Sequence, residues 1–155
     1  MTESNTLEYS NEALYDILDT VKTIALVGAS PKPERASYEV MEFLQERGYR
    51  VIPVNPVIAG QTLLGETVYA SLDDVPDAFD MVDIFRNSEA AGDITKETLA
   101  LNASKQPKVI WMQLEVINHE AAELAKSKGI KVIMDRCPKQ VTEKRLATET
   151  LTVNT

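Results

Sequence analysis

The sequence is poor in cysteine, histidine and tryptophan, with one of each among 155 residues. Because Cys137 has no partner within the chain, an intrachain disulfide is excluded, and a reducing compartment fits. No apolar run approaches the roughly 20 residues that cross a bilayer. The first twenty residues are acidic and contain no lysine or arginine, unlike a signal or transit peptide. We therefore expect a cytoplasmic protein.

The sequence also has no excess of positive charge. Lysine and arginine number 16 against 24 aspartates and glutamates, which gives a formal net charge of −8. Binding to nucleic acid or to an anionic membrane surface needs a basic face, so we expect neither partner. A small phosphorylated ligand is compatible with this charge, because one pocket needs only two or three well-placed cations.

Apolar strand patterns alternate with amphipathic helical patterns, which is typical of βαβ units around a parallel sheet. A short helix is predicted at 11–18. The predicted strands lie at 23–27, 50–54, 81–85, 108–113 and 131–134. With right-handed connections, this pattern predicts a Rossmann-like, doubly wound α/β fold with a parallel five-stranded sheet of order 3-2-1-4-5 and helices on both faces. We expect one domain over residues 1–146 and a loose tail over 147–155.

The segment GASPKPERASY, at 28–38, joins the first predicted strand to the next helix. Doubly wound sheets bind ligands beyond the carboxyl ends of their strands, beside strand one. Gly28 permits a close backbone turn, and a helix that starts near Ser37 offers free N–H groups to an anion. We predict that this loop holds a diphosphate, and the alternative is an ordinary surface loop. The predicted contacts are Gly28, Ala29, Ser30, Lys32, Arg35, Ser37 and Tyr38.

Two features argue against NAD as the ligand. The loop departs from the G-x-G-x-x-G fingerprint, because Ser30 and Pro33 occupy the other two glycine positions. The second strand ends in Asn55-Pro56, where NAD-binding domains carry an acidic residue for the ribose. A neutral strand end suits a ribose that bears a phosphate, which favours coenzyme A or NADP. The alternative is a simple turn, since Asn-Pro is a common turn pair.

Five segments carry a family pattern: ALVGASPKPERASY (25–38), GYRVIPVNP (48–56), VDIFRNSE (82–89), WMQLE (111–115) and VIMDRC (132–137). Together they resemble the stand-alone CoA-binding domain family, which is similar to the nucleotide-binding domain of the succinyl-CoA synthetase α subunit. The resemblance implies coenzyme A, free or acylated, with its ADP part over 28–38 and over Asn55 and Pro56. The pantetheine arm would run toward the loops after strands three to five, where Arg86, Gln113, Arg136 and Cys137 stand.

Two positions depart from that pattern. Glu115 stands where similar sequences usually have glycine, which bears on the path of the arm. Val57 stands where many carry a basic or aromatic residue, so contact with the ribose phosphate would rest on Lys32 and Arg35.

Two residues at the same end of the sheet have competing interpretations. Arg86 could reach the ligand or pair with Glu89 in the next helix. Cys137 follows Arg136, a cation that could lower the pKa of the thiol. Exchange with a disulfide of CoA would then give a mixed disulfide. The alternative for Cys137 is a small buried hydrophobe, which is what free cysteine usually is.

The sequence shows no catalytic motif: no nucleophile elbow, metal-ligand spacing or paired carboxylates. His119 is predicted to begin the helix after strand four as an exposed residue. The synthetase reaction needs a phosphorylated histidine on a second domain, which this sequence lacks. We expect a CoA-binding carrier, sensor or partner subunit without catalysis of its own. A homodimer is compatible with this expectation. The alternatives are an NADP-dependent oxidoreductase and a subunit of a CoA ligase that acts with a separate chain.

Overall fold

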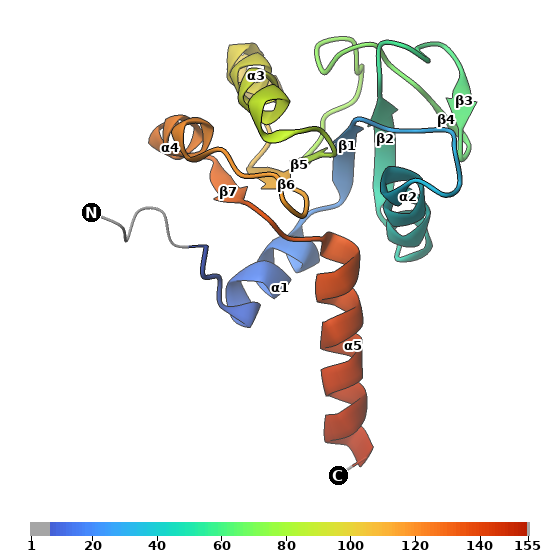
Figure 1. The fold of residues 1–155 in the computed structure, drawn as a ribbon, viewed down its shortest axis with the longest axis vertical. Helices are drawn as coiled ribbons and strands as arrows, with labels where there is room; N and C mark the ends of the chain where they lie inside the picture. The colour runs from blue at the N-terminus through green and yellow to red at the C-terminus, as the bar shows by residue number, and fades with distance from the viewer. Residues whose placement is uncertain (1–6, 155) are drawn as a thin grey trace.

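A computed structural model describes the backbone of residues 7–154 and the side chains of residues 7–150. Strands and helices alternate as predicted (Figure 1). The strands are β1 (Thr23–Val27), β2 (Arg50–Val54), β3 (Thr62–Leu63), β4 (Glu66–Thr67), β5 (Met81–Ile84), β6 (Val109–Met112) and β7 (Lys131–Ile133). The helices are α1 (Asn11–Thr20), α2 (Ala36–Glu46), α3 (Ser88–Ala100), α4 (His119–Ser127) and α5 (Pro138–Asn154), with a 3₁₀ turn at Ala103–Lys105.

The five long strands form a parallel sheet of order β2-β1-β5-β6-β7, and β3 pairs with β4 in a separate hairpin. The doubly wound α/β class is therefore confirmed, but the predicted strand order is wrong. The third long strand, β5, lies beside β1 and not outside β2. The reason is that the outer edge of β2 is already occupied: Tyr69 donates to Pro53 O, and Asn55 donates to Tyr69 O.

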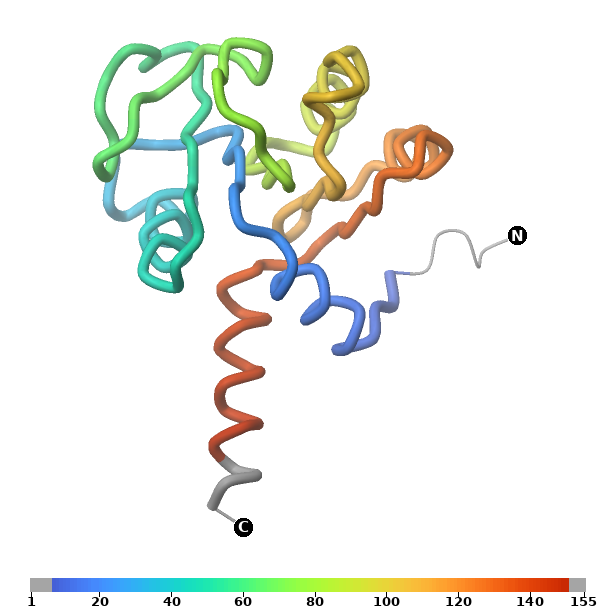
Figure 2. The backbone as a smooth tube through the Cα atoms, turned by 180° about the vertical axis from the view of Figure 1, so that it is seen from behind, coloured from blue at the N-terminus to red at the C-terminus, as the bar shows by residue number. Residues whose placement is uncertain are grey.

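Helices cover both faces of the sheet, as predicted (Figures 1 and 2). On one face, α1 and α2 pack their apolar sides onto Ile24, Leu26 and Trp111. On the other face, α3 and α4 pack onto Ala25, Val82 and Ile110. Adjacent residues along each strand enter opposite clusters because side chains alternate across a sheet.

Most helix starts follow the sequence signals. The Ser10 side chain caps α1 and that of Asn118 caps α4, and Ser and Asn are preferred N-cap residues. For α3 the cap is Asn87, which accepts from Ala90 N, and Ser88 is already helical. His119 begins α4 as predicted, although it is half-buried and not exposed.

Residues 147–154 differ from the sequence expectation. They continue α5, whose bounds are Pro138–Asn154, instead of forming a loose tail. Proline is favoured in the first turn of a helix, and once a helix has nucleated each further residue adds a hydrogen bond without needing an apolar stripe. Figure 1 shows the distal part of α5 extending away from the sheet. Within the described range, no helix has the length and hydropathy to span a membrane.

Candidate functional site

The order in which successive strands join the sheet reverses at β1, which has β2 on one side and β5 on the other. Ligands bind at such a switch point, beyond the carboxyl ends of the strands. Gly28 stands directly after β1 with φ +94°, and a Cβ there would lie 2.3 Å from Phe85 O. Its amide donates to Val54 O at 3.0 Å. Glycine at this position therefore allows the ends of three neighbouring strands to meet.

A cavity of about 580 Å³ opens at this junction, within the usual range of small-ligand sites. Its walls come from the β1–α2 loop, the first turn of α2, and the ends of β2 and β5. It is lined by Val27, Gly28, Ala29, Ser30, Lys32, Arg35, Ala36, Ser37, Val54, Asn55, Pro56, Val57, Phe85 and Arg86. The loop, the end of β2 and Arg86 are thus brought together as the sequence predicts.

The N-terminus of α2 faces this cavity without a side-chain cap. Its N-cap residue, Arg35, makes no capping hydrogen bond, whereas Ser10, Asn87 and Asn118 cap α1, α3 and α4. The first N–H groups of a helix have no partner inside it, and the helix dipole favours negative charge there. This end of α2 is therefore suited to a phosphate oxygen.

Three cations surround the cavity, although the protein as a whole is acidic. Lys32 and Arg35 come from the loop, and Arg86 comes from the segment after β5. All three are exposed, and none has an ion-pair partner within 4.0 Å in the part of the chain that the structure describes. The predicted alternative of an Arg86–Glu89 pair is therefore not formed. The cavity combines positive charge with free helix N–H groups.

Asn55 fixes the shape of the cavity. Its Nδ2 donates to Ala29 O at 2.8 Å, which joins the end of β2 to the β1–α2 loop, and its Oδ1 accepts from Val57 N at 2.8 Å. Because both ends of the amide are engaged inside the protein, its role is to position the loop. Within the loop, Ser30 Oγ accepts from Lys32 N at 3.1 Å. The position where NAD-binding domains place a carboxylate is thus neutral and already satisfied.

Four predicted contacts lie outside this lining: Tyr38, Gln113, Arg136 and Cys137. Tyr38 follows in the first turn of α2 and packs against the core on that face. The Arg136 guanidinium donates to Leu7 O at 2.6 Å and lies 5.1 Å from the centre of the Tyr9 ring. Arg136 thus holds the N-terminal segment. Its contact with a ligand stays a prediction, as do those of Tyr38 and Gln113.

Cys137 is 6% exposed and belongs to the core cluster on the α2 face. It also borders a separate cavity of about 300 Å³ together with Tyr9, Leu114 and Arg136. This surrounding fits the alternative of a small buried hydrophobe. The mixed disulfide stays a prediction, which intact-mass measurement after treatment with oxidised CoA would test.

Sequence reasoning missed the apolar lining of the cavity, namely Val27, Val54, Val57 and Phe85, together with Ala36. Val57 is 86% exposed, which is unusual for a large apolar side chain. A signal was available, since each of these residues directly adjoins a predicted contact. Ligand pockets at the switch point of an α/β sheet are lined mainly by apolar side chains, so the apolar residues beside the predicted contacts could have been included.

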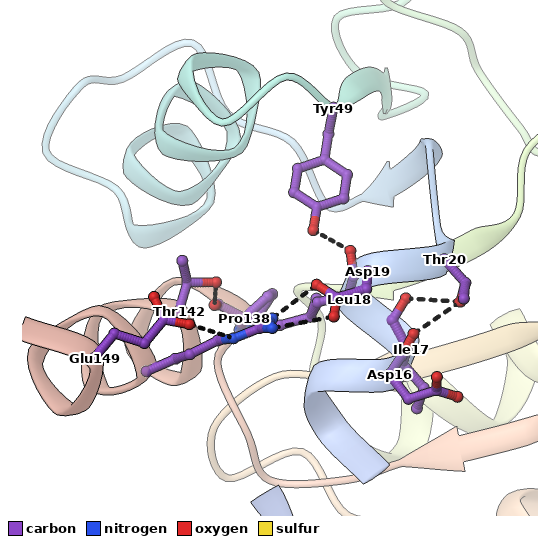
Figure 3. A network of polar contacts seen from close by, with 10 residues as sticks. Asp16, Ile17, Leu18, Asp19, Thr20, Tyr49, Pro138, Thr142 and Glu149 are labelled. Atoms are coloured by element: carbon purple, nitrogen blue, oxygen red, sulfur yellow. Dashed lines mark hydrogen bonds and ion pairs between the residues drawn. The ribbon is translucent and has the colours of Figure 1, made fainter. Parts of the chain in front are cut away.

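A second large cavity, of about 620 Å³, lies at the opposite end of the sheet, where β1 and β2 begin. Figure 3 shows its polar network, in which side chains from α1, α5 and the start of β2 meet. Arg145 is paired there with Asp19 at 2.7 Å and with Glu149 at 3.4 Å, and Tyr49 donates to Leu18 O. Two carboxylates, Asp19 and Glu149, therefore line this cavity beside its cations, whereas the cavity at Gly28 is lined by cations and no carboxylate among the described residues.

The described residues contain no group of three or more His, Cys, Asp or Glu side chains that could hold a metal ion. The chemistry available at the cavity is therefore that of backbone N–H groups, hydroxyls and three cations. This arrangement can bind and orient a phosphorylated molecule.

Comparison with known proteins agrees with this geometry. The protein YneT of Bacillus subtilis (strain 168) is 38% identical over 130 residues, which cover 84% of this chain and 92% of YneT. A solved structure from Pyrococcus horikoshii OT3 is 37% identical with a TM-score of 0.81, covering 89% of this chain and 93% of that one. The structure of cell-free ID.343 from Thermus thermophilus is 35% identical with a TM-score of 0.80, covering 88% and 98%. The CoA binding domain family matches residues 22–143, which include every strand of the sheet and the whole cavity, and the chain belongs to that family.

Proposed function

We propose that the protein binds coenzyme A at the cavity beside Gly28, with the diphosphate on the N-terminus of α2. The single observation that carries this proposal is the cavity itself. It opens at the switch point of the sheet, against an uncapped helix N-terminus and three cations without ion-pair partners among the described residues. Family membership supports coenzyme A as the ligand.

The proposed contacts divide between the two sides of the cavity. The N–H groups of Ala36 and Ser37 bind diphosphate oxygens, and Lys32 and Arg35 neutralise their charge from the loop. Arg86 reaches the phosphates from the β5 side. Pro56 and Val57 supply an apolar surface at the rim, which suits the flat adenine ring.

The end of β2 supports coenzyme A over NAD. Both polar ends of the Asn55 side chain are bonded within the protein, so no carboxylate stands ready for the ribose hydroxyls. A carboxylate there would also repel the ribose phosphate of CoA. A neutral β2 end accepts that phosphate without repulsion.

We propose a binding role, as carrier or sensor of CoA or acyl-CoA, without catalysis by this chain. Among the described residues, those that line the cavity include no histidine, cysteine or carboxylate. Ser30, Ser37 and Lys32 are nucleophile types, but this lining offers no general base beside them to activate them. The lining is therefore suited to holding a ligand for use elsewhere.

Thermal unfolding with CoA, dephospho-CoA, NADP and NAD at equal concentration tests the proposal. A ligand at 100 times its Kd adds about 2.7 kcal/mol of stability, which raises the Tm by several degrees in a domain of this size. We expect the largest shift with CoA, a smaller one with dephospho-CoA and none with NAD. A shift with NADP alone would indicate an oxidoreductase, and no shift with any ligand would overturn the proposed site.

A further inference from the structure

Asp83 lies at the centre of the sheet and is completely buried. Among the described residues, three buried side-chain oxygens have no hydrogen-bond partner: both carboxyl oxygens of Asp83 and Oε1 of Gln113. Buried polar atoms are almost always paired, because leaving one unpaired costs about 1–3 kcal/mol. Three orphaned acceptors therefore need an explanation.

The two residues lie on the same face of neighbouring strands. Asp83 in β5 is in register with Leu26 in β1 and Trp111 in β6. Gln113 stands two residues beyond Trp111, and its N–H donates to Ile84 O, which continues the pairing of β5 with β6. Side chains repeat every second residue along a strand, so Gln113 is a diagonal neighbour of Asp83, within reach of a long side chain.

In the part of the chain that the structure describes, no charged side chain pairs with the Asp83 carboxylate. The titratable side chains of the cluster on this face are Tyr9, Tyr15, Tyr38, Tyr49 and Cys137. On the covering helices, Lys139 pairs with Glu39 and Glu143, and Arg145 pairs with Asp19 and Glu149, all away from Asp83. Burial alone raises the pKa of the Asp83 carboxyl well above its ordinary value.

A proton resolves the orphaned atoms. An ionised carboxylate and an amide oxygen are both acceptors and repel each other, whereas a carboxylic acid can donate to the amide oxygen. We propose that Asp83 is protonated in the folded protein and donates to Gln113 Oε1, forming a buried acid–amide pair that makes the candidate site sensitive to alkaline pH.

The pair is connected to the candidate cavity through β5. Asp83 stands two residues before Phe85, whose carbonyl lies against Gly28. Phe85 and Arg86 form the wall of the cavity on that side. An unpaired charge at Asp83 cannot stay in the apolar core, so its ionisation draws water into the sheet or displaces β5. Either response loosens the contact between Gly28 and Phe85.

Denaturant unfolding between pH 6 and 9 tests the pair without any ligand. In this range the unfolded chain has lost the Asp83 proton, while the folded chain keeps it up to its raised pKa. Stability therefore falls as pH rises, and the unfolding equilibrium constant increases up to tenfold per pH unit. We expect Asp83→Asn to abolish this slope, since an amide donates to Gln113 Oε1 and does not titrate. Asp93→Asn, at an exposed position in α3, is expected to keep the slope.

Measurements on the unsubstituted protein provide a second test in case Asp83→Asn does not fold. The ¹³C resonance of the Asp83 carboxyl is expected to report a protonated acid at pH 7. Emission of Trp111, the single tryptophan and the register partner of Asp83, is expected to change as this carboxyl ionises. A carboxyl that is already ionised at pH 7 would overturn the proposal, as would equal pH slopes for the wild type and Asp83→Asn. These readouts do not depend on CoA, so they stand or fall separately from the proposed function.

Discussion

The backbones of Gly28 and Phe85 lie in contact at the switch point of the sheet. An added Cβ on Gly28 would lie 2.3 Å from Phe85 O, a separation that real Cβ atoms do not reach. The contact joins the β1–α2 loop, which carries Lys32 and Arg35, to the β5 end, which carries Arg86. The cations of the candidate site are thus positioned relative to one another by one glycine.

We predict that Gly28→Ala destabilises the protein by at least about 2 kcal/mol, because strain at positive φ adds to an overpacked contact with backbone. Urea unfolding measures the loss. Gly60→Ala is the matched control, since Gly60 has φ +91° but nothing within 4 Å of an added Cβ. It is expected to lose only about 1 kcal/mol from backbone strain. Equal losses for the two variants would contradict a role for the contact with Phe85.

We predict that Asn55→Ala weakens both the fold and ligand binding. The substitution removes the hydrogen bond to Ala29 O that joins the β2 end to the loop, and the local one from Val57 N, with an expected loss of about 1–2 kcal/mol. CoA affinity falls as well, because the loop is no longer held. Asn102→Ala serves as the control, since Asn102 is exposed and makes no capping bond. Calorimetric titration with CoA would contradict the prediction if both variants bound equally well.

Arg86 provides a direct test of the electrostatics of the cavity. Replacing it with glutamine is expected to lower CoA affinity roughly 10–100-fold, because a charge-assisted hydrogen bond contributes about 1.5–3 kcal/mol. The thermal stability of the free protein is expected to change little. Arg47→Gln, an exposed arginine at the other end of the sheet, controls for net charge. If both variants bound CoA like the wild type, Arg86 would have no part in the site.

The candidate cavity was largely predictable because it combines one continuous loop with the ends of neighbouring strands. Gly28, Ser30, Lys32 and Arg35 share one loop, and the rule for parallel sheets places strand ends together. Long-range contacts were not predictable in the same way. The strand order depends on which segment takes the outer edge of β2, and no local pattern shows that Tyr69 takes it.

Arg136 and Asp83 are two further residues whose long-range contacts could not be predicted from the local sequence. Arg136 bonds to Leu7, 129 residues earlier in the chain, so its position after β7 could not show what it contacts. Asp83 reads as one polar residue within an apolar strand, and only the packed structure shows that its carboxyl has no partner. Sequence patterns report the elements, whereas partners across the fold depend on packing.

The ion pair between Asp19 and Arg145 predicts a weakness at acidic pH. A side-chain hydrogen bond from Arg145 lowers the pKa of Asp19 below its ordinary value of 3.8. Arg145 also lies 4.6 Å from the centre of the Tyr15 ring, so it joins α5 to α1. Because the pKa of Asp19 is lower in the folded state, the pair stabilises the protein fully at pH values above the ordinary pKa of 3.8. This stabilisation is lost as pH falls through the lowered pKa.

The side chain of Arg145 is 30% exposed and that of Asp19 is 55% exposed. We therefore expect a coupling energy of only about 0.2–1 kcal/mol. A double-mutant cycle of Asp19→Asn and Arg145→Gln at neutral pH and low salt measures it. The coupling is expected to shrink as pH falls below the ordinary Asp pKa of 3.8 and through the lowered pKa of Asp19, and in high salt, which screens exposed charges. The i,i+3 pair of Glu123 and Lys126 within α4 is the control, because it joins no two elements. A cycle that gave zero coupling at neutral pH would leave the packing of Tyr15, and not the charges, as the link between α1 and α5.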